Sequence, residues 1–353
     1  MGIIVKKGDL LKEQTDAIIN TVNCVGVMGK GIALQFKQKW PENFKAYEKA
    51  CKEKKIRPGK VFVHELGKLA GKPYYIINFP TKDHWRGKSE LSFIESGLKD
   101  LIEYIKHHDI RSISIPPLGC GNGGLQWSEV RTLINNSFRS LDNQIDVHLF
   151  EPDGAPSAKS MVTNTTKPAM TVGRSILIKL LSIYREMEYS LSKIEIQKLC
   201  YFAQESGQLL NLNYKKHQFG PYADNLRHVL NAINGHYITG VGDHDTSEAN
   251  ISLVPKAIGE AEEFLSNHKD SIERLKRVAT LIEGFETPYG MELLATVHWA
   301  ATRDVKHLNA DNVIKAVHNW EPSQPLWNKR KQSLMQQSHI KIALERLQQE
   351  GWV

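Results

Sequence analysis

The amino-acid sequence predicts an α/β domain, with a mixed sheet flanked by helices, followed by a mostly α domain. The chain has 353 residues, more than one hydrophobic core usually organises, so two domains are expected. In the first half, short apolar runs alternate with amphipathic stretches, a pattern typical of an α/β sheet. In the second half, apolar residues recur almost throughout at helical spacing.

Short runs rich in β-branched and aromatic residues predict buried strands in the first half. These strands are expected at Ile3–Val5, Ala17–Asn20, Tyr74–Phe79, Ile113–Ile115 and Val147–Phe150. The stretches between them with helical periodicity are Ile32–Trp40, Asn43–Lys54, Ser92–His107 and Trp127–Ser140. Because strands and helices alternate, we expect helices on both faces of the sheet.

A polar segment over residues 153–170, rich in Ser, Thr and Pro and without periodicity, predicts a flexible linker. It separates a first domain over residues 1–152 from a second domain over residues 171–353. Helices of the second domain are expected at Ile176–Met187, Lys193–Leu212, Tyr222–Asn234, Lys256–Asn267, Ile272–Gly284, Pro288–Thr302, Asp311–His318 and Lys329–Gln349. Strands are indicated only at Ile251–Val254 and Gly240–Val241.

Composition excludes several classes of protein. No apolar run approaches the ~20 residues that cross a bilayer, and the first ten residues offer no export segment, so a cytoplasmic protein without a membrane partner is expected. The cysteines are scattered and the histidines lack ligand spacing, which predicts neither disulfides nor a metal. Residues 1–153 carry a net charge of +5, out of +7 for the chain. This bias fits either a solvated helix end around Lys52–Arg57 or attraction to a polyanion.

Two glycine-rich loops follow predicted strands, and each opens into a helix. The first covers residues 23–33 and the second covers residues 116–124. Glycine lets a backbone approach a phosphate closely, and a helix start supplies free N–H groups. Two such loops at the carboxyl ends of strands predict a diphosphate-binding crevice. Neither loop contains GKS or GKT, which argues against ATP or GTP hydrolysis.

The order and spacing of these motifs resemble the macrodomain family over roughly residues 1–152. The matching motifs are GDL at residues 8–10, DAIIN at residues 16–20, GVMGKGIA at residues 26–33 and PPLGCGNGGLQW at residues 116–127. The segment NFPTKDHW at residues 78–85 is similar to the branch of the human terminal ADP-ribose glycohydrolase, and within that branch to the DarG antitoxins. Those antitoxins reverse the ADP-ribosylation of DNA by DarT toxins.

The resemblance implies a role for each motif residue. Asp9 would accept a hydrogen bond from the adenine amino group, the Leu10 backbone would meet the ring, and Asn23 would fix the distal ribose. The two glycine loops would hold the diphosphate through backbone N–H groups. The further residues of the implied ADP-ribose site are Asn20, Gly29, Lys30, Gly31, Ile32, Thr81, Gly119, Cys120, Gly121, Asn122 and Gly123.

Lys82, at the end of a predicted strand, would lie beside the anomeric carbon as the catalytic residue; the alternative is a solvated surface lysine. Its amine can attack the ribose or stabilise charge that leaves it. The human relative has a carboxylate in the second loop that releases a lysine-linked intermediate, where this chain has Gly123. Asp83 could replace that carboxylate, or Lys82 could act without a stable adduct.

Three residues that follow Lys82 are candidates for contact with DNA: His84, Trp85 and Arg86. His84 could also assist proton transfer, although a histidine beside Trp85 and Arg86 is more often an ordinary loop residue.

The second domain resembles the Panacea (SocA-like) antitoxin domain through Leu199–Gln204 and Phe219–Tyr222, over about residues 175–310. The resemblance implies that this domain binds a toxin. The alternative is that the aromatic residues on one helix face form a core and that Gly220 and Pro221 form a turn.

The sequence therefore predicts an antitoxin that hydrolyses the bond between ADP-ribose and DNA, expected to be at thymidine in single-stranded DNA. It would also bind a DarT-type toxin through its second domain. No cofactor and no metal are expected. The alternatives are a non-catalytic ADP-ribose reader, or a hydrolase of ADP-ribosyl-glutamate in proteins or of O-acyl-ADP-ribose esters. Lys82 favours an enzyme, and the missing loop carboxylate favours a reader.

Overall fold

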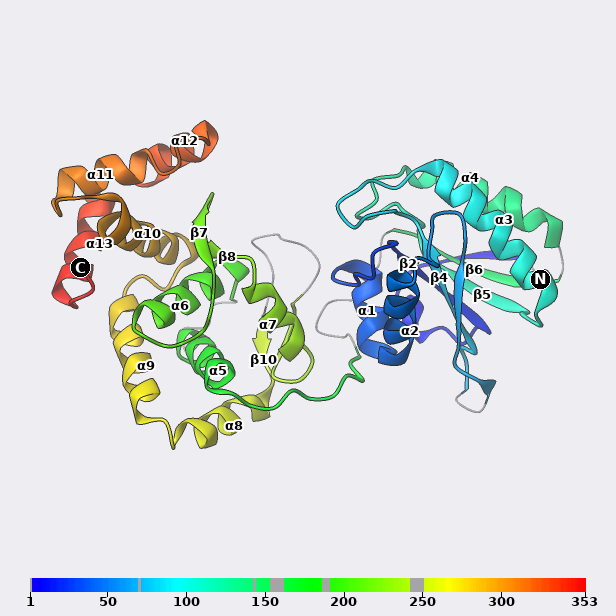
Figure 1. The fold of residues 1–353 in the computed structure, drawn as a ribbon, viewed down its shortest axis with the longest axis horizontal. Helices are drawn as coiled ribbons and strands as arrows, with labels where there is room; N and C mark the ends of the chain where they lie inside the picture. Colours follow the sequence, from blue (N-terminus) through cyan, green and yellow to red (C-terminus); the bar gives the residue numbers. More distant parts are fainter. Residues whose placement is uncertain (1, 69–70, 142–143, 153–161, 186–190, 242–250) are drawn as a thin grey trace. The chain divides into compact units, whose positions relative to one another are not determined.

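The computed structural model describes residues 2–68, 71–141, 144–152, 162–185, 191–241 and 251–353 (Figure 1). The chain divides into two compact units, residues 1–166 and residues 167–353. Residues 153–161 of the predicted linker lie outside the described residues. The Asn164 N–H donates to the Gln38 carbonyl of the first unit (2.8 Å), whereas the Lys167 ammonium pairs with Glu260 of the second (2.6 Å).

The first unit is built on a six-stranded mixed sheet in the order β1-β6-β5-β2-β4-β3. Its strands are β1 (Ile3–Lys6), β2 (Ala17–Val22), β3 (Phe62–Glu65), β4 (Tyr75–Pro80), β5 (Ser112–Ile115) and β6 (Asp146–Phe150). All neighbours pair in parallel except β3, which runs antiparallel to β4. β3 is an addition to the strands expected from the sequence. It is an edge strand that is only partly buried, so it lacks the continuous apolar run of a central strand.

Helices cover both faces of this sheet, as the alternation of elements predicts. α1 (Gly31–Lys39) and α2 (Pro41–Lys52) lie on one face, and α3 (Leu91–His107) and α4 (Trp127–Phe138) lie on the other (Figure 1). Successive residues of β2 serve the two layers: Ile18 shares a core with Phe36 of α1, and Ile19 shares one with Leu98 of α3. A short 3-10 helix, η1 (Leu10–Lys12), follows β1, and another, η3 (Arg139–Leu141), extends α4.

The second unit is mostly helical, which confirms the predicted class. Its helices are α5 (Val172–Arg185), α6 (Lys193–Glu205), α7 (Leu226–Ile233), α8 (Pro255–Leu265), α9 (Lys269–Ile282), α10 (Pro288–Trp299), α11 (Ala310–His318), α12 (Pro325–Leu334) and α13 (Gln337–Gln349), and a π-helical stretch, η5 (Ala300–Asp304), continues α10. Two small antiparallel pairs join β7 (Tyr214–His217) to β8 (Gly220–Ala223) and β9 (Ile238–Thr239) to β10 (Ser252–Leu253). Among the described residues, no helix is long and apolar enough to cross a membrane.

Three of the helices expected in this unit have wrong bounds. The helix expected at Lys193–Leu212 ends at Glu205, because Gly207 turns the chain with φ +95. The one expected at Tyr222–Asn234 begins only at Leu226, since Tyr222 belongs to the β7–β8 hairpin. The one expected at Lys329–Gln349 is two helices. They are separated where the buried Met335 leaves the helical conformation, with ψ 82.

Two smaller expectations also differ. The strand indicated at Gly240–Val241 lies two residues earlier, at β9, where it pairs with β10 inside the expected Ile251–Val254. The end of the helix expected at Ile176–Met187 lies outside the described residues, which stop at Arg185.

Candidate active site

Three segments meet at one edge of the sheet of the first unit. β5, β2 and β4 are neighbours and run parallel, so the segments that follow them lie side by side. We call residues 23–31 the first loop, residues 81–89 the lysine segment and residues 116–124 the second loop. The first loop touches the lysine segment directly, because the Cys24 N–H donates to the Asp83 carbonyl at 2.9 Å.

The first loop is closed by its own asparagine. Asn23 Nδ2 donates to the Val27 carbonyl (2.5 Å), and its Oδ1 accepts from the N–H groups of Val25 (3.0 Å) and Val27 (3.3 Å). The buried Tyr47 of α2 donates to the Asn23 carbonyl at 2.5 Å. These contacts use both polar atoms of a buried side chain, so Asn23 shapes the loop. Its contact with the distal ribose stays a prediction.

Backbone donors suited to a phosphate lie where α1 begins. Lys30 is extended (φ −149), and Gly31 has φ +63, a conformation that glycine adopts easily. The first turn of α1 closes where the Leu34 N–H donates to the Lys30 carbonyl at 3.3 Å. The N–H groups from Gly31 to Ala33 have no acceptor within the helix. Together with Gly29, they suit the predicted contact with one phosphate.

The second loop is too tightly packed for a side chain at Gly123. A Cβ atom there would lie 2.1 Å from the Gly119 carbonyl oxygen and 2.3 Å from Ser89 Oγ. The Ser89 N–H also donates to the Gly123 carbonyl at 3.1 Å, and Gly119 has φ +70. The packing of the second loop therefore leaves no space for a carboxylate side chain at residue 123. Gly121, by contrast, is exposed, and a Cβ atom there meets nothing within 4 Å.

Ser89 belongs to this site although no sequence motif singled it out. It is 6 % exposed, and its Oγ has no hydrogen-bond partner among the described residues. Its closeness to Gly119 and Gly123 arises only from the folding of the lysine segment against the second loop, so no local pattern could have revealed it.

Lys82 reaches from the lysine segment to the second loop. Its ammonium donates to the Asn122 carbonyl. Burial lowers the pKa of Lys82 below its usual value, and no carboxylate of the described residues offsets that effect. A lowered pKa raises the fraction of neutral amine near neutral pH, the form that attacks carbon.

The cysteines of the two loops are protonated thiols. Cys24 Sγ donates to the Lys82 carbonyl at 3.4 Å, and Cys120 Sγ donates to the Leu118 carbonyl at 3.5 Å. Burial, with the nearby Asp83, raises the pKa of Cys24 to about 12, and burial raises the pKa of Cys120 to about 11. Because a thiolate is the reactive form of cysteine, the amine of Lys82 is the better nucleophile among these three side chains.

Asp9 and Leu10 lie farther along the same edge, after β1. Asp9 Oδ1 accepts the Leu11 N–H at 3.0 Å and so caps η1, while Leu10 is buried. Asp9 Oδ2 lies 3.9 Å from the Lys12 ammonium. One carboxylate oxygen is therefore committed to the cap, and the other is left for the predicted adenine contact.

Asn20 and Thr81 are both buried. Asn20 is fully buried, and its Nδ2 donates to Asn78 Oδ1 at 2.9 Å. Asn78 donates in turn to Asn43 Oδ1 of α2 (2.7 Å), and Asn43 donates back (3.3 Å). We call Asn20, Asn43 and Asn78 the buried amide cluster. The Thr81 N–H extends the sheet by donating to the Val22 carbonyl at 3.0 Å.

A turn with exposed cationic and aromatic side chains follows Lys82. The Gly87 N–H donates to the His84 carbonyl (2.9 Å), and the Arg86 N–H donates to His84 Nδ1 (3.2 Å). The Arg86 guanidinium lies 4.5 Å from the centre of the Trp85 ring, which is 41 % exposed. His84 Nδ1 thus accepts a hydrogen bond within the turn. The predicted contact of these residues with DNA stays a prediction.

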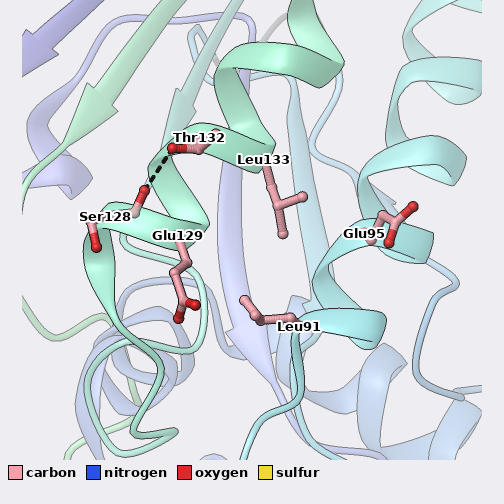
Figure 2. Close-up of a pocket in the computed structure, with 6 residues that line it drawn as sticks. All are labelled: Leu91, Glu95, Ser128, Glu129, Thr132 and Leu133. Carbon is pink, nitrogen blue, oxygen red and sulfur yellow. Dashed lines mark hydrogen bonds between the residues drawn. The ribbon is translucent and has the colours of Figure 1, made fainter.

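A separate shallow groove lies between α3 and α4. Figure 2 shows its lining, which consists of Leu91, Glu95, Ser128, Glu129, Thr132 and Leu133. Two carboxylates and no basic side chain line it, so it does not suit a diphosphate. Within the described part of the chain, no three His, Cys, Asp or Glu side chains gather as a metal site requires.

Comparisons with known proteins agree with this geometry. The model of the Macro domain family matches residues 19–134. A DNA ADP-ribosyl glycohydrolase of Thermus aquaticus is 45% identical over 348 residues, which covers 98% of this chain and 92% of the relative. The chain belongs to the DNA ADP-ribosyl glycohydrolase family. The macrodomain fold and the resemblance to DarG-type proteins, both predicted from the motifs, are confirmed.

Two further known proteins are similar to part of this DNA ADP-ribosyl glycohydrolase family member. The solved macrodomain of Mycobacterium tuberculosis DarG is 52% identical and covers 43% of this chain and 100% of that chain, with a TM-score of 0.42. A DNA ADP-ribosyl transferase–DNA ADP-ribosyl glycohydrolase fusion protein of Thermosipho africanus is 34% identical over 158 residues, 40% of this chain and 40% of the fusion.

Proposed function

We propose that this chain hydrolyses the N-glycosidic bond between ADP-ribose and a base of DNA, in the crevice formed by the first loop, the lysine segment and the second loop. The observation that carries the proposal is the position of Lys82. Its ammonium contacts the Asn122 carbonyl of the second loop, while its own carbonyl contacts Cys24 of the first. Lys82 is thus in contact with both glycine-rich loops. The relative from Thermus aquaticus, which aligns over nearly the whole chain, supports the substrate.

In the proposed complex, the backbone N–H groups at the start of α1 and in the second loop hold the diphosphate, and this fixes the distal ribose beside Lys82. The neutral amine attacks the anomeric carbon as the bond to the base breaks, and the base leaves with a proton from solvent or a side chain. Alternatively, the ammonium stabilises negative charge on the departing base while water attacks. Burial lowers the pKa of Lys82, which favours the neutral amine that the first route needs.

Release of an adduct would need a base for water, and the packing at Gly123 leaves Asp83 as the carboxylate nearest in sequence to Lys82. Reduction with borohydride during turnover, followed by mass spectrometry, tests this step. ADP-ribose trapped on the Lys82 peptide supports the adduct. If more of it is trapped in Asp83→Asn than in the unchanged chain, Asp83 is the base that releases it. No trapped lysine in either protein supports action without an adduct.

The substrate is tested by parallel incubation with a single-stranded oligonucleotide ADP-ribosylated at thymidine and with a peptide ADP-ribosylated at glutamate. We expect release of ADP-ribose from the oligonucleotide. Release from the peptide alone would favour the protein-directed or ester-directed hydrolase. Binding of ADP-ribose without release from either substrate would favour the non-catalytic reader.

We also propose that the second unit binds the ADP-ribosyltransferase whose product the first unit removes, in the cytoplasm where both would meet DNA. The fusion protein of Thermosipho africanus, whose name joins a transferase to a glycohydrolase, supports this pairing. Tyr201 and Phe202 of the motif at Leu199–Gln204 are fully buried, so they serve the core and the binding surface is elsewhere. The half-exposed Phe219 and Tyr222 on the β7–β8 hairpin are the accessible part of the two antitoxin-like motifs.

The full chain carrying Lys82→Ala separates the two activities. We expect it to co-purify with the transferase and to restore growth of cells that express it, although it no longer removes ADP-ribose. If this catalytically inactive chain neither bound the transferase nor restored growth, hydrolysis would be the protein's sole activity against the toxin.

A further inference from the structure

The net positive charge of the first unit is concentrated in one stretch. Residues 45–60 contain seven basic and two acidic side chains. Residues 1–153 contain 23 basic and 18 acidic side chains in all, so the rest of that range is balanced at sixteen of each. In the structure, this stretch covers α2 from Lys45 to its end at Lys52 and the residues that follow, up to Lys60. The whole charge excess of residues 1–153 is thus found at one place.

This stretch lies against the first loop. A Cβ atom at Gly26 would lie 3.5 Å from Glu48 Cγ and 3.6 Å from Cys51 Cβ, so the loop rests on α2 one residue before Lys52. The same loop contacts the lysine segment through Cys24, as described above. The basic end of α2 is therefore separated from Lys82 by the width of a single loop.

The surface between them is apolar and open. Val25 and Val27 of the first loop are 46 % and 40 % exposed, so together they present apolar surface to solvent. Beyond Lys82, the exposed Trp85 carries the Arg86 guanidinium over its ring. Exposed aromatic and apolar side chains beside cations are the combination on which single-stranded nucleic acids stack their bases and rest their phosphates.

The end of α2 keeps a cation where glycine would fit better. Lys54 has φ +57, and the Lys55 N–H donates to the Ala50 carbonyl at 2.9 Å, the arrangement of a helix end that glycine usually occupies. Lys52 is paired with Glu48 (2.9 Å), but among the described residues no ion pair reaches Lys54 or Arg57. A disfavoured backbone conformation that retains an unpaired charge beside an active site indicates a function for that charge.

We infer that the DNA strand runs from Trp85 and Arg86, past Val25 and Val27, to the end of α2, where Lys52, Lys54 and Arg57 hold its phosphates. This inference rests on the proposed function, because it extends the path of the same substrate. The helix dipole alone explains basic residues in the last turn of α2, but Lys54 and Arg57 lie beyond Lys52, where the helix ends.

The test compares two substrates and two triple variants. The substrates are an ADP-ribosylated thymidine dinucleotide and a 20-nucleotide strand with one ADP-ribosylated thymidine. The first variant is Lys52→Gln, Lys54→Gln and Arg57→Gln. The matched control, Lys99→Gln, Lys106→Gln and Arg111→Gln, removes the same charge from α3 and its following loop, on the other face of the sheet.

We expect the first variant to raise KM for the 20-nucleotide strand about tenfold at 0.1 M salt, and to reduce the slope of log KM against log salt by about 2, because each phosphate contact on a single strand contributes roughly 0.7. Its kcat and KM for the dinucleotide stay unchanged, and the control changes neither substrate. Equal effects of the two variants on the long strand would overturn the inference. Failure of the unchanged chain to cleave either substrate would overturn the proposed function instead.

Lys54→Gly separates charge from structure. Glycine relieves the left-handed strain, so the melting temperature should stay level or rise, while the affinity for the long strand falls about threefold. A variant that is as stable and binds the long strand as tightly as the unchanged chain would show that Lys54 contacts no phosphate.

Discussion

Both units contain lysines whose pKa is lowered by burial, but the two settings differ. Lys82 is half-buried at the edge of the sheet, and its ammonium donates to the exposed Asn122. In the second unit, Lys198 and Lys331 are almost fully buried, and burial lowers their pKa values to about 7 and about 8. Lys198 donates to the Pro221 carbonyl at 2.5 Å, and Lys331 pairs with Glu292 at 2.7 Å.

This difference shows that a perturbed pKa does not by itself identify a catalytic residue. The lysines of the second unit are perturbed more strongly than Lys82, yet they face a hairpin and a helix rather than an opening. What distinguishes Lys82 is its place at the carboxyl ends of parallel strands, between glycine-rich loops of which the first opens into the free N–H groups of α1. The same contrast applies to the motifs: the glycine-rich loops are predicted to form a site, whereas the buried aromatics of α6 form a core.

The largest expected effect tests Lys82 itself. Lys82→Ala should reduce kcat/KM for the ADP-ribosylated oligonucleotide by 10³- to 10⁴-fold, or about 4–5.5 kcal/mol of transition-state stabilisation. The affinity for free ADP-ribose, measured by calorimetry, should change by less than a few-fold, because backbone groups hold the ligand. Unimpaired turnover by this variant would remove Lys82 from the mechanism.

The next effect tests whether the buried lysines are structural. Glu292→Gln leaves Arg330 and Lys331 without their carboxylate, and should reduce the unfolding free energy of the second unit by about 3–5 kcal/mol. Glu262→Gln, which breaks an exposed pair with Lys179, is the matched control and should cost about 1 kcal/mol or less. Chemical denaturation measures both. A similar loss in both variants would contradict the structural role.

A smaller effect tests the second loop. Gly123→Ala forces the loop away from the Gly119 carbonyl and Ser89, and should weaken ADP-ribose binding at least tenfold, roughly 1.4 kcal/mol. Gly121→Ala has free space, so circular dichroism should find the fold unchanged, and any loss of affinity then reports direct contact of that backbone with ligand. If calorimetry finds equal, undiminished affinity for both variants, the second loop does not hold the diphosphate.

The smallest effect concerns pH. The folded-state pKa of Lys198, about 7, lies below the ordinary value of 10.5, so between these values the unfolded chain binds more protons than the folded chain. The unfolding free energy therefore rises with pH across that window, and the burial penalty is complete below pH about 7. Lys198→Met should flatten this rise between pH 6.5 and 9 and add about 1 kcal/mol of stability at pH 6.5. Parallel pH profiles for the two proteins would be evidence against a buried charge.

The sequence predicted most of the first unit because its signals are local. Apolar runs located the central strands, and glycine spacing located both loops. Ser89 and Asn43 could not be found in this way, since their partners are distant in the chain and only folding brings them together. The hairpin at Tyr222 was missed for a related reason: its pairing partner, not its own composition, makes it a strand.

The buried amide cluster has a consequence for the length of DNA that the protein recognises. Asn43 and Asn78 exchange two hydrogen bonds, which tie α2 to β4, and Lys82 lies two residues beyond the end of β4. These hydrogen bonds therefore help to set the spacing between Lys82 and the cations after α2. The affinity of the protein should therefore depend on the length of the bound strand. Affinity plotted against oligonucleotide length should rise in one step, at the length that first reaches Lys54, and should remain level for longer strands.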